Sequence, residues 1–229
     1  MPMRKEWTWI GGFGPELMLC AASVRVGPAR TAWWAVWDGE RLHERSYRRR
    51  GPVAVSPERV RVPDVLDLAV EPGAPWAARG GAMWTRKRPA RLTGTALGRP
   101  VELRGLIDES AGRHPRSMSW WWSAGVGELA DGRAVTWNLV DGLHDGPSGS
   151  ERAVWIDGVP GEVPPQPFHG FAGVGDLRFT ALATRARKEN LVLIASDYEQ
   201  PFGTFAGALP AGGALRAGYG VMERHRVRW

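Results

Sequence analysis

DESAGRHPRSMSWWWSAGVGELADGRAVTWNLVDG, residues 108–142, is the stretch that decides the fold. It predicts a β-hairpin with three consecutive tryptophans, Trp120–Trp122, on one arm and Trp137 on the other. The Asp131-Gly132 pair between the arms readily adopts the positive φ angles of a tight turn between antiparallel strands. A loop with four ionisable residues is expected to lead into this hairpin: Asp108, Glu109, His114 and Arg116.

The same order of strand, turn and strand recurs along the chain. Thirty glycines and eighteen prolines interrupt the sequence too often for long helices. Short runs rich in Val, Leu, Trp and Thr recur between turn signals, which indicates an all-β protein whose neighbouring strands pair as in an up-and-down barrel. Beside the hairpin, we expect strands at residues 17–26, 31–37, 41–47, 60–62, 66–70, 91–96, 100–106, 151–156, 159–163, 177–183, 191–196, 203–209 and 215–222.

Three segments are expected to lie outside the strands. The glycines of IGGFG, residues 10–14, predict a loop before the first strand. Residues 184–189 are the best candidate for a short helical turn. Several prolines predict a connection that cannot lie in a central strand, namely Pro160, Pro164, Pro165 and Pro167.

Length and composition limit the class of protein. With 229 residues and 43% hydrophobic content, the chain is long enough for a sizeable core. Cys20 is the single cysteine, which excludes an internal disulfide and a cysteine zinc site. The sequence contains no run of about 20 apolar residues and no signal-peptide pattern, so we expect a cytoplasmic protein without a membrane span.

The positive charge does not indicate a nucleic-acid-binding protein. Of the 30 basic residues only Lys5, Lys87 and Lys188 are lysine, so 27 are arginine. Arginine, alanine, glycine and proline dominate the chain together, which points to a compositional bias of the coding genome. The basic residues are spread among acidic ones and accompany no recognition helix, zinc finger or RNP pattern, and we therefore expect no nucleic-acid partner.

A series of motifs resembles a bacterial family known as domain of unknown function 2804. The motifs, in order, are WTRK at 84–87, LTGTALGRPVELRGLIDESAG at 92–112, HPRSMSWWWSAG at 114–125, TWNLVDG at 136–142, SERAVWIDG at 150–158, NLVLIASDYEQPFGTFAG at 190–207 and GYGVMERHRVRW at 218–229. The likeness covers nearly all of the chain from Leu17 onward. Two positions depart from the family pattern. Arg113 stands where an aromatic residue is usual, and Arg226 stands where an acidic residue is usual.

The resemblance implies a fold more than a function. The family is distantly similar to lipocalin-like proteins that include carotenoid hydratases and tocopherol cyclases. That similarity implies a lipocalin (calycin)-like antiparallel β-barrel or paired barrel halves around an apolar ligand. We expect two tightly packed halves, residues 1–105 and 106–229, that meet near Gly105.

The first candidate site combines the ionisable residues before the hairpin with its tryptophans. An acid that protonates an alkene must stay neutral near pH 7, and an apolar pocket raises a carboxyl pKa in that direction. Asp108 is the candidate acid, with His114 and Arg116 to orient it or a polar ligand end. Trp120 and Trp122, on one face of a strand, would form the cavity wall, and Trp137 is a further candidate ligand contact. Alternatively, Asp108 caps a turn and pairs with Arg116, and the tryptophans, Trp137 included, are simply core.

Two further groups could contribute to a site. Asn138 and Glu151 are polar residues on otherwise apolar strands and need partners if they are buried. A C-terminal group consists of Glu223, His225 and Trp229, with Tyr198, Gln200 and Phe202 from preceding strands. In this group Glu223 is a second candidate acid, and Glu223 and His225 could meet Arg116 or His114 across a closed barrel. Asp141, His144 and Asp145 have metal-ligand chemistry but lie in a Gly- and Ser-containing loop, so we expect no metal site.

The sequence supports three functional hypotheses. The preferred one is binding of a hydrophobic small molecule, such as an isoprenoid, polyketide or lipid-like compound, in a tryptophan-lined cavity without a cofactor. The second is a hydratase, cyclase or isomerase that acts on such a ligand by acid catalysis. The third is a structural barrel whose aromatic side chains fill its interior. The sequence leaves the oligomeric state open.

Overall fold

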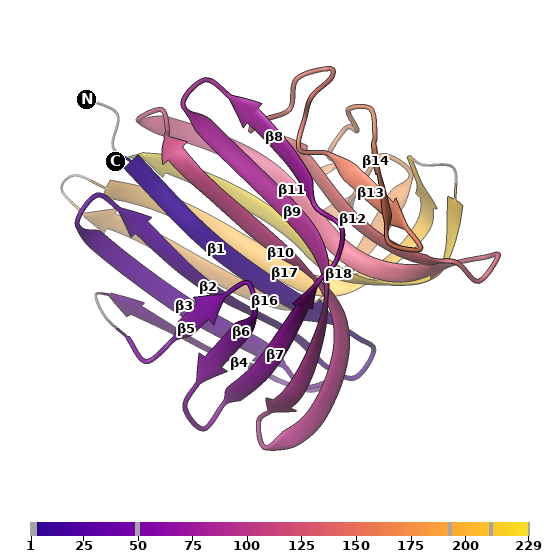
Figure 1. Ribbon diagram of the computed structural model, residues 1–229, viewed down its shortest axis with the longest axis horizontal. Helices are drawn as coiled ribbons and strands as arrows, with labels where there is room; N and C mark the ends of the chain where they lie inside the picture. The colour runs from indigo at the N-terminus through magenta and orange to yellow at the C-terminus, as the bar shows by residue number, and fades with distance from the viewer. Residues whose placement is uncertain (1–3, 49–50, 192–193, 211–212, 229) are drawn as a thin grey trace. The chain divides into compact units, whose positions relative to one another are not determined.

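Two compact units divide the chain, Met1–His114 and Pro115–Trp229. The computed structural model describes residues 4–48, 51–191, 194–210 and 213–228. Each unit holds one curled antiparallel sheet (Figure 1), and the helical content of the described residues is a single 3₁₀ turn at Gly170–Ala172. The predicted all-β fold with little helix is therefore confirmed.

The N-terminal unit is a ten-stranded sheet in the described part of the chain. Its order is β4-β3-β2-β1-β10-β9-β7-β6-β5, and β8 also pairs with β9. Neighbours in sequence mostly pair, and the long β10 returns to β1. The strands are β1 (Arg4–Phe13), β2 (Met18–Val26), β3 (Ala29–Trp37), β4 (Leu42–Arg48), β5 (Ala54–Ser56), β6 (Arg59–Val62), β7 (Leu66–Pro72), β8 (Trp76–Gly80), β9 (Met83–Ala96) and β10 (Arg99–Arg113).

The C-terminal unit repeats this plan with eight strands among its described residues. Its order is β14-β13-β12-β11-β18-β17-β16-β15, in which β18 returns to pair with β11. The strands are β11 (Ser117–Leu129), β12 (Ala134–Asp141), β13 (Ala153–Ile156), β14 (Val159–Glu162), β15 (Gly173–Val174), β16 (Leu177–Leu191), β17 (Ile194–Leu209) and β18 (Gly213–Arg228). The predicted hairpin at the centre of the sequence is thus β11–β12.

Alternating apolar residues give each sheet its own hydrophobic core. In the N-terminal unit, Val60, Val62, Leu66 and Leu68 lie inward from β6 and β7 and pack with Ile10, Leu92 and Ile107, while the residues between them are exposed. In the C-terminal unit, Trp137 packs edge-on against Phe205 at a centroid distance of 5.0 Å, within a cluster that includes Phe179 and Met222. Each cluster removes one face of its sheet from water, which is the main stabilising contribution.

The predicted loop at residues 10–14 is wrong, because its first four residues lie in β1. Gly11 and Gly12 pair with Leu106 and Gly105 of β10. The Trp9 ring lies over Gly11, where a Cβ would come within 2.2 Å of its Cη2 atom. Glycine here makes room for an indole and is not a turn signal.

The predicted helical turn at residues 184–189 is also wrong. These residues belong to β16, which pairs with β17 along its length in the described residues. Arg185 and Arg187 alternate with smaller residues, so a period of two places both side chains on one face. The expected strand at 191–196 is β17 from Ile194 onward, and its residues 192–193 lie outside the described residues.

The predicted loop before the hairpin is short. Asp108 and Glu109 lie inside β10 and only residues 114–116 connect β10 to β11. The proposed boundary at residues 105–106 falls within β10, whereas the two units divide at the end of that strand.

Two turns show how Asp-Gly pairs close the hairpins. Asp157 and Gly158 both have positive φ, 48° and 82°, and form the two-residue turn between β13 and β14. Between β11 and β12 the turn is longer, with Gly132 at φ 88° and its N–H donated to the Leu129 carbonyl.

Strand β14 forms one edge of the C-terminal sheet. Its Pro160 is opposite Trp155, one pair beyond the Ile156–Val159 pair that flanks the turn. Hydrogen-bonded and non-hydrogen-bonded pairs alternate along an antiparallel ladder, so the nitrogen of Pro160 faces away from β13.

Candidate functional site

One face of the N-terminal sheet carries buried polar and aromatic side chains from three adjacent strands. The register places Trp7 beside Ser110 and Thr85, and Trp9 beside Asp108 and Lys87. Directly opposed residues point to the same side of a sheet. We call this surface the lysine face; it consists of Lys5, Trp7 and Trp9 of β1, Thr85 and Lys87 of β9, and Asp108 and Ser110 of β10.

Asp108, the first candidate acid, is held by two donors on the lysine face. Lys87 Nζ lies 2.5 Å from Asp108 Oδ1, and Trp7 Nε1 donates to Oδ2 at 3.3 Å. The Lys87 side chain is 2% exposed and that of Asp108 13%. A buried ion pair of this kind costs desolvation and is retained when both partners are well bonded.

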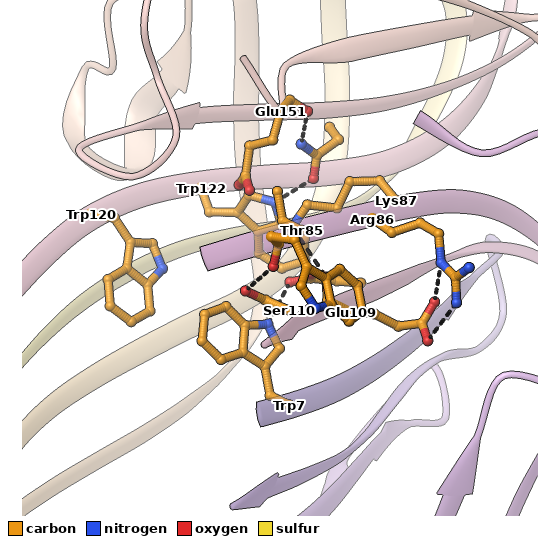
Figure 2. Close-up of polar contacts among 12 residues, drawn as sticks. Trp7, Thr85, Arg86, Lys87, Glu109, Ser110, Trp120, Trp122 and Glu151 are labelled. Atoms are coloured by element: carbon orange, nitrogen blue, oxygen red, sulfur yellow. Dashed lines mark hydrogen bonds and ion pairs between the residues drawn. The ribbon is translucent and has the colours of Figure 1, made fainter. Parts of the chain in front are cut away.

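Glu109 points to the opposite face of β10 and binds two arginines. Arg86 donates to both of its carboxylate oxygens, at 3.0 and 3.1 Å (Figure 2). Arg88 Nη2 also donates to Oε2, at 2.7 Å. The pKa of the Arg86 guanidinium is raised, mainly by its hydrogen bonds to Glu109. The cluster is a charge-assisted network at one end of the strand.

His114 is buried at the end of the N-terminal unit. Its ring centroid lies 4.9 Å from that of Trp7, with the planes tilted by 45°. His114 and Asp108 therefore share Trp7 as a neighbour. Arg116, expected beside them, is an exposed residue at the start of the C-terminal unit.

One face of the C-terminal sheet carries most of the other predicted site residues. The register places Trp120 opposite His225 and Trp122 opposite Glu223, and Tyr198 lies on the other side of His225. We call this surface the tryptophan face; it consists of Trp120 and Trp122 of β11, Asn138 of β12, Ser196, Tyr198 and Gln200 of β17, and Glu223 and His225 of β18.

Glu223, the second candidate acid, accepts hydrogen bonds from two neutral side chains. Trp120 Nε1 donates to Oε1 at 2.9 Å, and Gln200 Nε2 donates to Oε2 at 2.7 Å. Glu223 is 7% exposed and Gln200 is fully buried. The carboxyl group is thus fixed between an indole and an amide.

Trp122 and Asn138 form a second buried pair on the same face. The Trp122 indole donates to Asn138 Oδ1 at 2.7 Å, and Asn138 Nδ2 donates to the Glu151 carbonyl at 2.7 Å (Figure 2). Asn138 is fully buried and Glu151 is 2% exposed. Asn138 therefore has the hydrogen-bond partners that a buried amide needs, namely the Trp122 indole and the backbone carbonyl of Glu151.

His225 is enclosed by aromatic rings. Its centroid lies 4.5 Å from Trp120 and 5.2 Å from Tyr198, and its Nε2 is 2.9 Å from Ser196 Oγ. Desolvation by burial lowers the pKa of His225 to about 3, with Arg185 adding to the decrease and Asp197 opposing it. The imidazole is therefore neutral at pH 7. Arg185 lies over the Tyr198 ring at 4.9 Å, a cation–π contact.

The remaining predicted residues do not join either face. Trp137 belongs to the inner core, on the opposite side of the hairpin from Trp120 and Trp122, and donates to Ser123 Oγ at 3.1 Å. Asp145 Oδ2 accepts the Gly142 N–H at 2.7 Å, which is a turn contact. The described residues contain no cluster of three His, Cys, Asp or Glu side chains placed to hold a metal ion. Trp229 lies outside the described residues.

Several residues of the two faces were missed in the sequence. Trp7, Lys87, Ser196 and Arg185 are not among the predicted site residues, because their partners lie on other strands. One signal was available for Lys87, because lysine is rare here and a rare residue type invites a specific explanation.

No helix among the described ranges has both the length and the apolar character needed to cross a membrane.

The comparisons support the fold expected from the motifs. The model of the family "domain of unknown function 2804" matches residues 166–229, which confirms the resemblance to that family over this part of the chain. No curated protein matches the sequence significantly. A protein assigned as AttH from Nitrosomonas europaea has a similar solved structure, with a TM-score of 0.54 and 15% identity over 96% of this chain and 92% of that one.

Two further solved structures have lower TM-scores. Kievitone hydratase from Nectria haematococca has a TM-score of 0.48 and 9% identity over 96% of this chain and 88% of its own. CghA bound to Sch210972 has a TM-score of 0.47 and 10% identity over 99% and 88%. At these identities a structural likeness concerns the fold alone.

Proposed function

We propose that the protein binds a hydrophobic small molecule, of isoprenoid, polyketide or lipid-like chemistry, and that the tryptophan face contributes to the contact. The supporting observation is the arrangement of Trp120 and Trp122. Both indoles lie on one face, and each N–H is already used, by Glu223 and by Asn138 respectively. The ring of Trp120, which is partly exposed, thus offers apolar surface in a fixed orientation, and Trp122 lies buried beside it.

The polar groups of this face support the same proposal. Small-molecule sites combine apolar and aromatic surface with a few well-placed polar groups. Glu223, Gln200 and His225 are such groups, and all three lie next to an indole or to each other. They would anchor one polar end of a mostly apolar ligand.

Retinol binding tests the proposal, because retinol absorbs where tryptophan emits and quenches it by energy transfer on binding. Trp120→Phe removes the indole N–H and part of its surface, and we expect the retinol Kd to rise about tenfold, a loss of about 1.4 kcal/mol. Trp121→Phe is the matched control. Trp121 lies on the opposite side of the same strand, against Phe168 and Phe171, so retinol binding is expected to persist in this variant.

Two outcomes would count against this proposal. Equal retinol affinities in the two variants would exclude the tryptophan face. Absence of saturable quenching, together with no lipid recovered by mass spectrometry from purified protein, would favour a purely structural barrel.

Acid catalysis on such a ligand is the second candidate function, and the position of Glu223 favours it. Glu223 is largely withdrawn from water and held in place by Trp120 and Gln200, so an acid at this position would meet an apolar ligand in a fixed orientation. As acid, Glu223 would donate a proton to an alkene carbon, water would add to the resulting carbocation, and the Glu223 carboxylate would take up the proton that the added water loses. Asp108, on the lysine face, is the other proposed acid.

Incorporation of oxygen from labelled water tests the hydratase form of this function. Farnesol is incubated with the protein in H₂¹⁸O and analysed by mass spectrometry. We expect a hydrated, labelled product with the wild type and at least a tenfold loss with Glu223→Gln, which retains the shape of the side chain. Product formation that is equal in both proteins would exclude Glu223 as the acid.

A further inference from the structure

The Ser196–His225 pair lies at the part of the tryptophan face where the polar end of a ligand can be specified. His225 Nε2 and Ser196 Oγ are 2.9 Å apart. Trp120 and Tyr198 flank His225 on its two sides, with ring centroids 4.5 and 5.2 Å away. Ser196, His225 and Trp120 are each half-buried, so this pair and one indole beside it are partly exposed to solvent.

The pair retains hydrogen-bonding capacity after its own bond is made. Among the described residues, the bond between Ser196 and His225 is the single side-chain hydrogen bond of either group. A neutral imidazole has one donor and one acceptor nitrogen, and a serine hydroxyl has one donor and two acceptor lone pairs. In either tautomer of His225, the pair therefore keeps one donor and two acceptor positions. Burial lowers the pKa of His225 to about 3, so this count applies at neutral pH.

The two guanidinium groups on the tryptophan face each have a contact within it. Strand β16 places Arg185 and Arg187 on this face. Arg187 binds Glu189 at 2.6 Å, while Arg185 is 3% exposed and lies over the Tyr198 ring. An ionised ligand group would lose hydration here beside the carboxyl group of Glu223, and desolvation of a charge is costly. A neutral polar group suits this surface better than a carboxylate.

We propose that the ligand of the tryptophan face carries a hydroxyl group, which forms a hydrogen bond with the Ser196–His225 pair. An alcohol both donates and accepts, so it can bind the retained donor or a retained acceptor in either tautomer of His225. The half-buried Trp120 ring then contacts the apolar part of the ligand next to that hydroxyl group. The inference rests on the proposed function and narrows its isoprenoid, polyketide or lipid-like ligands to alcohols. Ser196 and His225 are thereby residues that determine specificity.

Retinol and retinoic acid test the inference, because they share one polyene and differ at the polar end. Both absorb where tryptophan emits, so quenching titrations of the intact chain at pH 8 give a Kd for each ligand. We expect the wild type to bind retinol at least about ten times more tightly than retinoic acid, because the acid must give up the hydration of its charge. Ser196→Ala should weaken retinol binding about fivefold, the effect of one neutral hydrogen bond, and change retinoic acid binding less than about twofold.

Two further variants separate the hydrogen bond from a general disturbance of the sheet. Ser196→Thr keeps the hydroxyl group and should keep the preference for retinol. Ser119→Ala makes the matched change on the opposite side of the sheet, since Ser119 precedes Trp120 in β11, and both Kd values should stay unchanged.

The outcomes distinguish this inference from the proposed function. Retinol binding that depends on Trp120 but not on Ser196 would overturn the inference alone. Equal wild-type affinities for the two ligands, or equal losses for both ligands in Ser196→Ala, would also overturn it. Absence of saturable quenching by either ligand would overturn the proposed function and the inference together.

Discussion

Individual residues of the two faces show which properties of a site can be predicted from the sequence. The period of two places Trp120 and Trp122 on one face, and the structure confirms it. The partners of Asp108 could not be foreseen, because Lys87 and Trp7 come from strands 21 and 101 residues away in the chain. Only the register of β1, β10 and β9 brings them together. Side-chain direction was thus predictable from local sequence, while hydrogen-bond partners were not.

The Asp108–Lys87 pair is expected to be important for stability. Asp108→Asn keeps the size of the side chain but leaves a buried ammonium without its carboxylate, and we expect a loss of about 3 kcal/mol in the free energy of unfolding. Asp67→Asn is the control, since Asp67 and its partner Arg59 are half exposed and the pair should contribute less than about 1 kcal/mol. Urea unfolding measures both values. Equal losses in the two variants would contradict this view of the buried pair.

His225 is expected to make stability depend on pH. Its pKa is about 3 in the folded protein and near 6.5 when unfolded, so the unfolded state binds the extra proton between these values. Stability therefore falls as pH falls from 6.5 toward 3, by up to about 1.4 kcal/mol per pH unit. Urea unfolding of the wild type and of His225→Gln should show that the difference between their free energies of unfolding shrinks as the pH falls over this range.

The control for this measurement is His169→Gln, which replaces an exposed histidine. Its stability should follow the wild type at every pH. A His225→Gln curve that also runs parallel to the wild type would show that the imidazole takes up its proton equally in both states.

At the scale of elements, turn chemistry was the most reliable signal. Asp-Gly pairs lie in the turns of the hairpins β3–β4 (Asp38-Gly39), β11–β12 (Asp131-Gly132) and β13–β14 (Asp157-Gly158), and the strands expected on either side of each turn are present. The errors came where a residue type has two uses. Gly11, which accommodates the Trp9 ring in β1, belongs to a glycine-rich pattern that predicts a loop, and the alternating arginines of β16 lie in a segment that predicts a helical turn. Tertiary packing determined the structure of both segments, and a local sequence pattern carries no information about that packing.

The β13–β14 turn provides a test of this reasoning. Gly158 has φ 82°, a conformation that costs a residue with a Cβ about 1 kcal/mol, so Gly158→Ala should destabilise the protein by that amount. Gly161→Ala, three residues further on in β14, is the control. A Cβ there would meet the Val154 carbonyl oxygen at 4.0 Å, an ordinary contact, and we expect a change within about 0.5 kcal/mol. Urea midpoints compare the two, and a smaller effect at Gly158 would contradict the turn assignment.

For the whole molecule, composition predicted the all-β class and the motif order predicted the lipocalin-like fold. Neither could predict where the two units divide, because β10 continues through the expected boundary without a change in composition.

The net charge of +6 does not by itself show how many basic side chains are paired within the protein. Many arginines are used in ion pairs within their own sheet, including Arg59–Asp67, Arg91–Glu102, Arg133–Asp131, Arg187–Glu189 and Arg216–Glu128.

This use of arginine predicts weak binding to nucleic acid. Nonspecific DNA binding depends on basic groups that neutralise phosphates. Because several of its arginines are paired to carboxylates, the protein should show no saturable binding to a fluorescent 20-base-pair duplex at about 150 mM salt, at the affinities of roughly 10⁻⁴ to 10⁻⁶ M typical of nonspecific binders. Fluorescence anisotropy measures this. Saturation in that range, lost at higher salt, would reverse the conclusion drawn from the sequence.

The proline in β14 has a consequence for how these molecules behave in a crowded solution. An unprotected edge strand exposes amide protons that can pair with any other extended polypeptide, and ordered aggregates begin to grow by such pairing. Where Pro160 sits, the outward-pointing amide proton does not exist, so an incoming chain meets a gap in the ladder. A protein composed almost entirely of extended segments can in this way resist strand pairing between molecules at that edge.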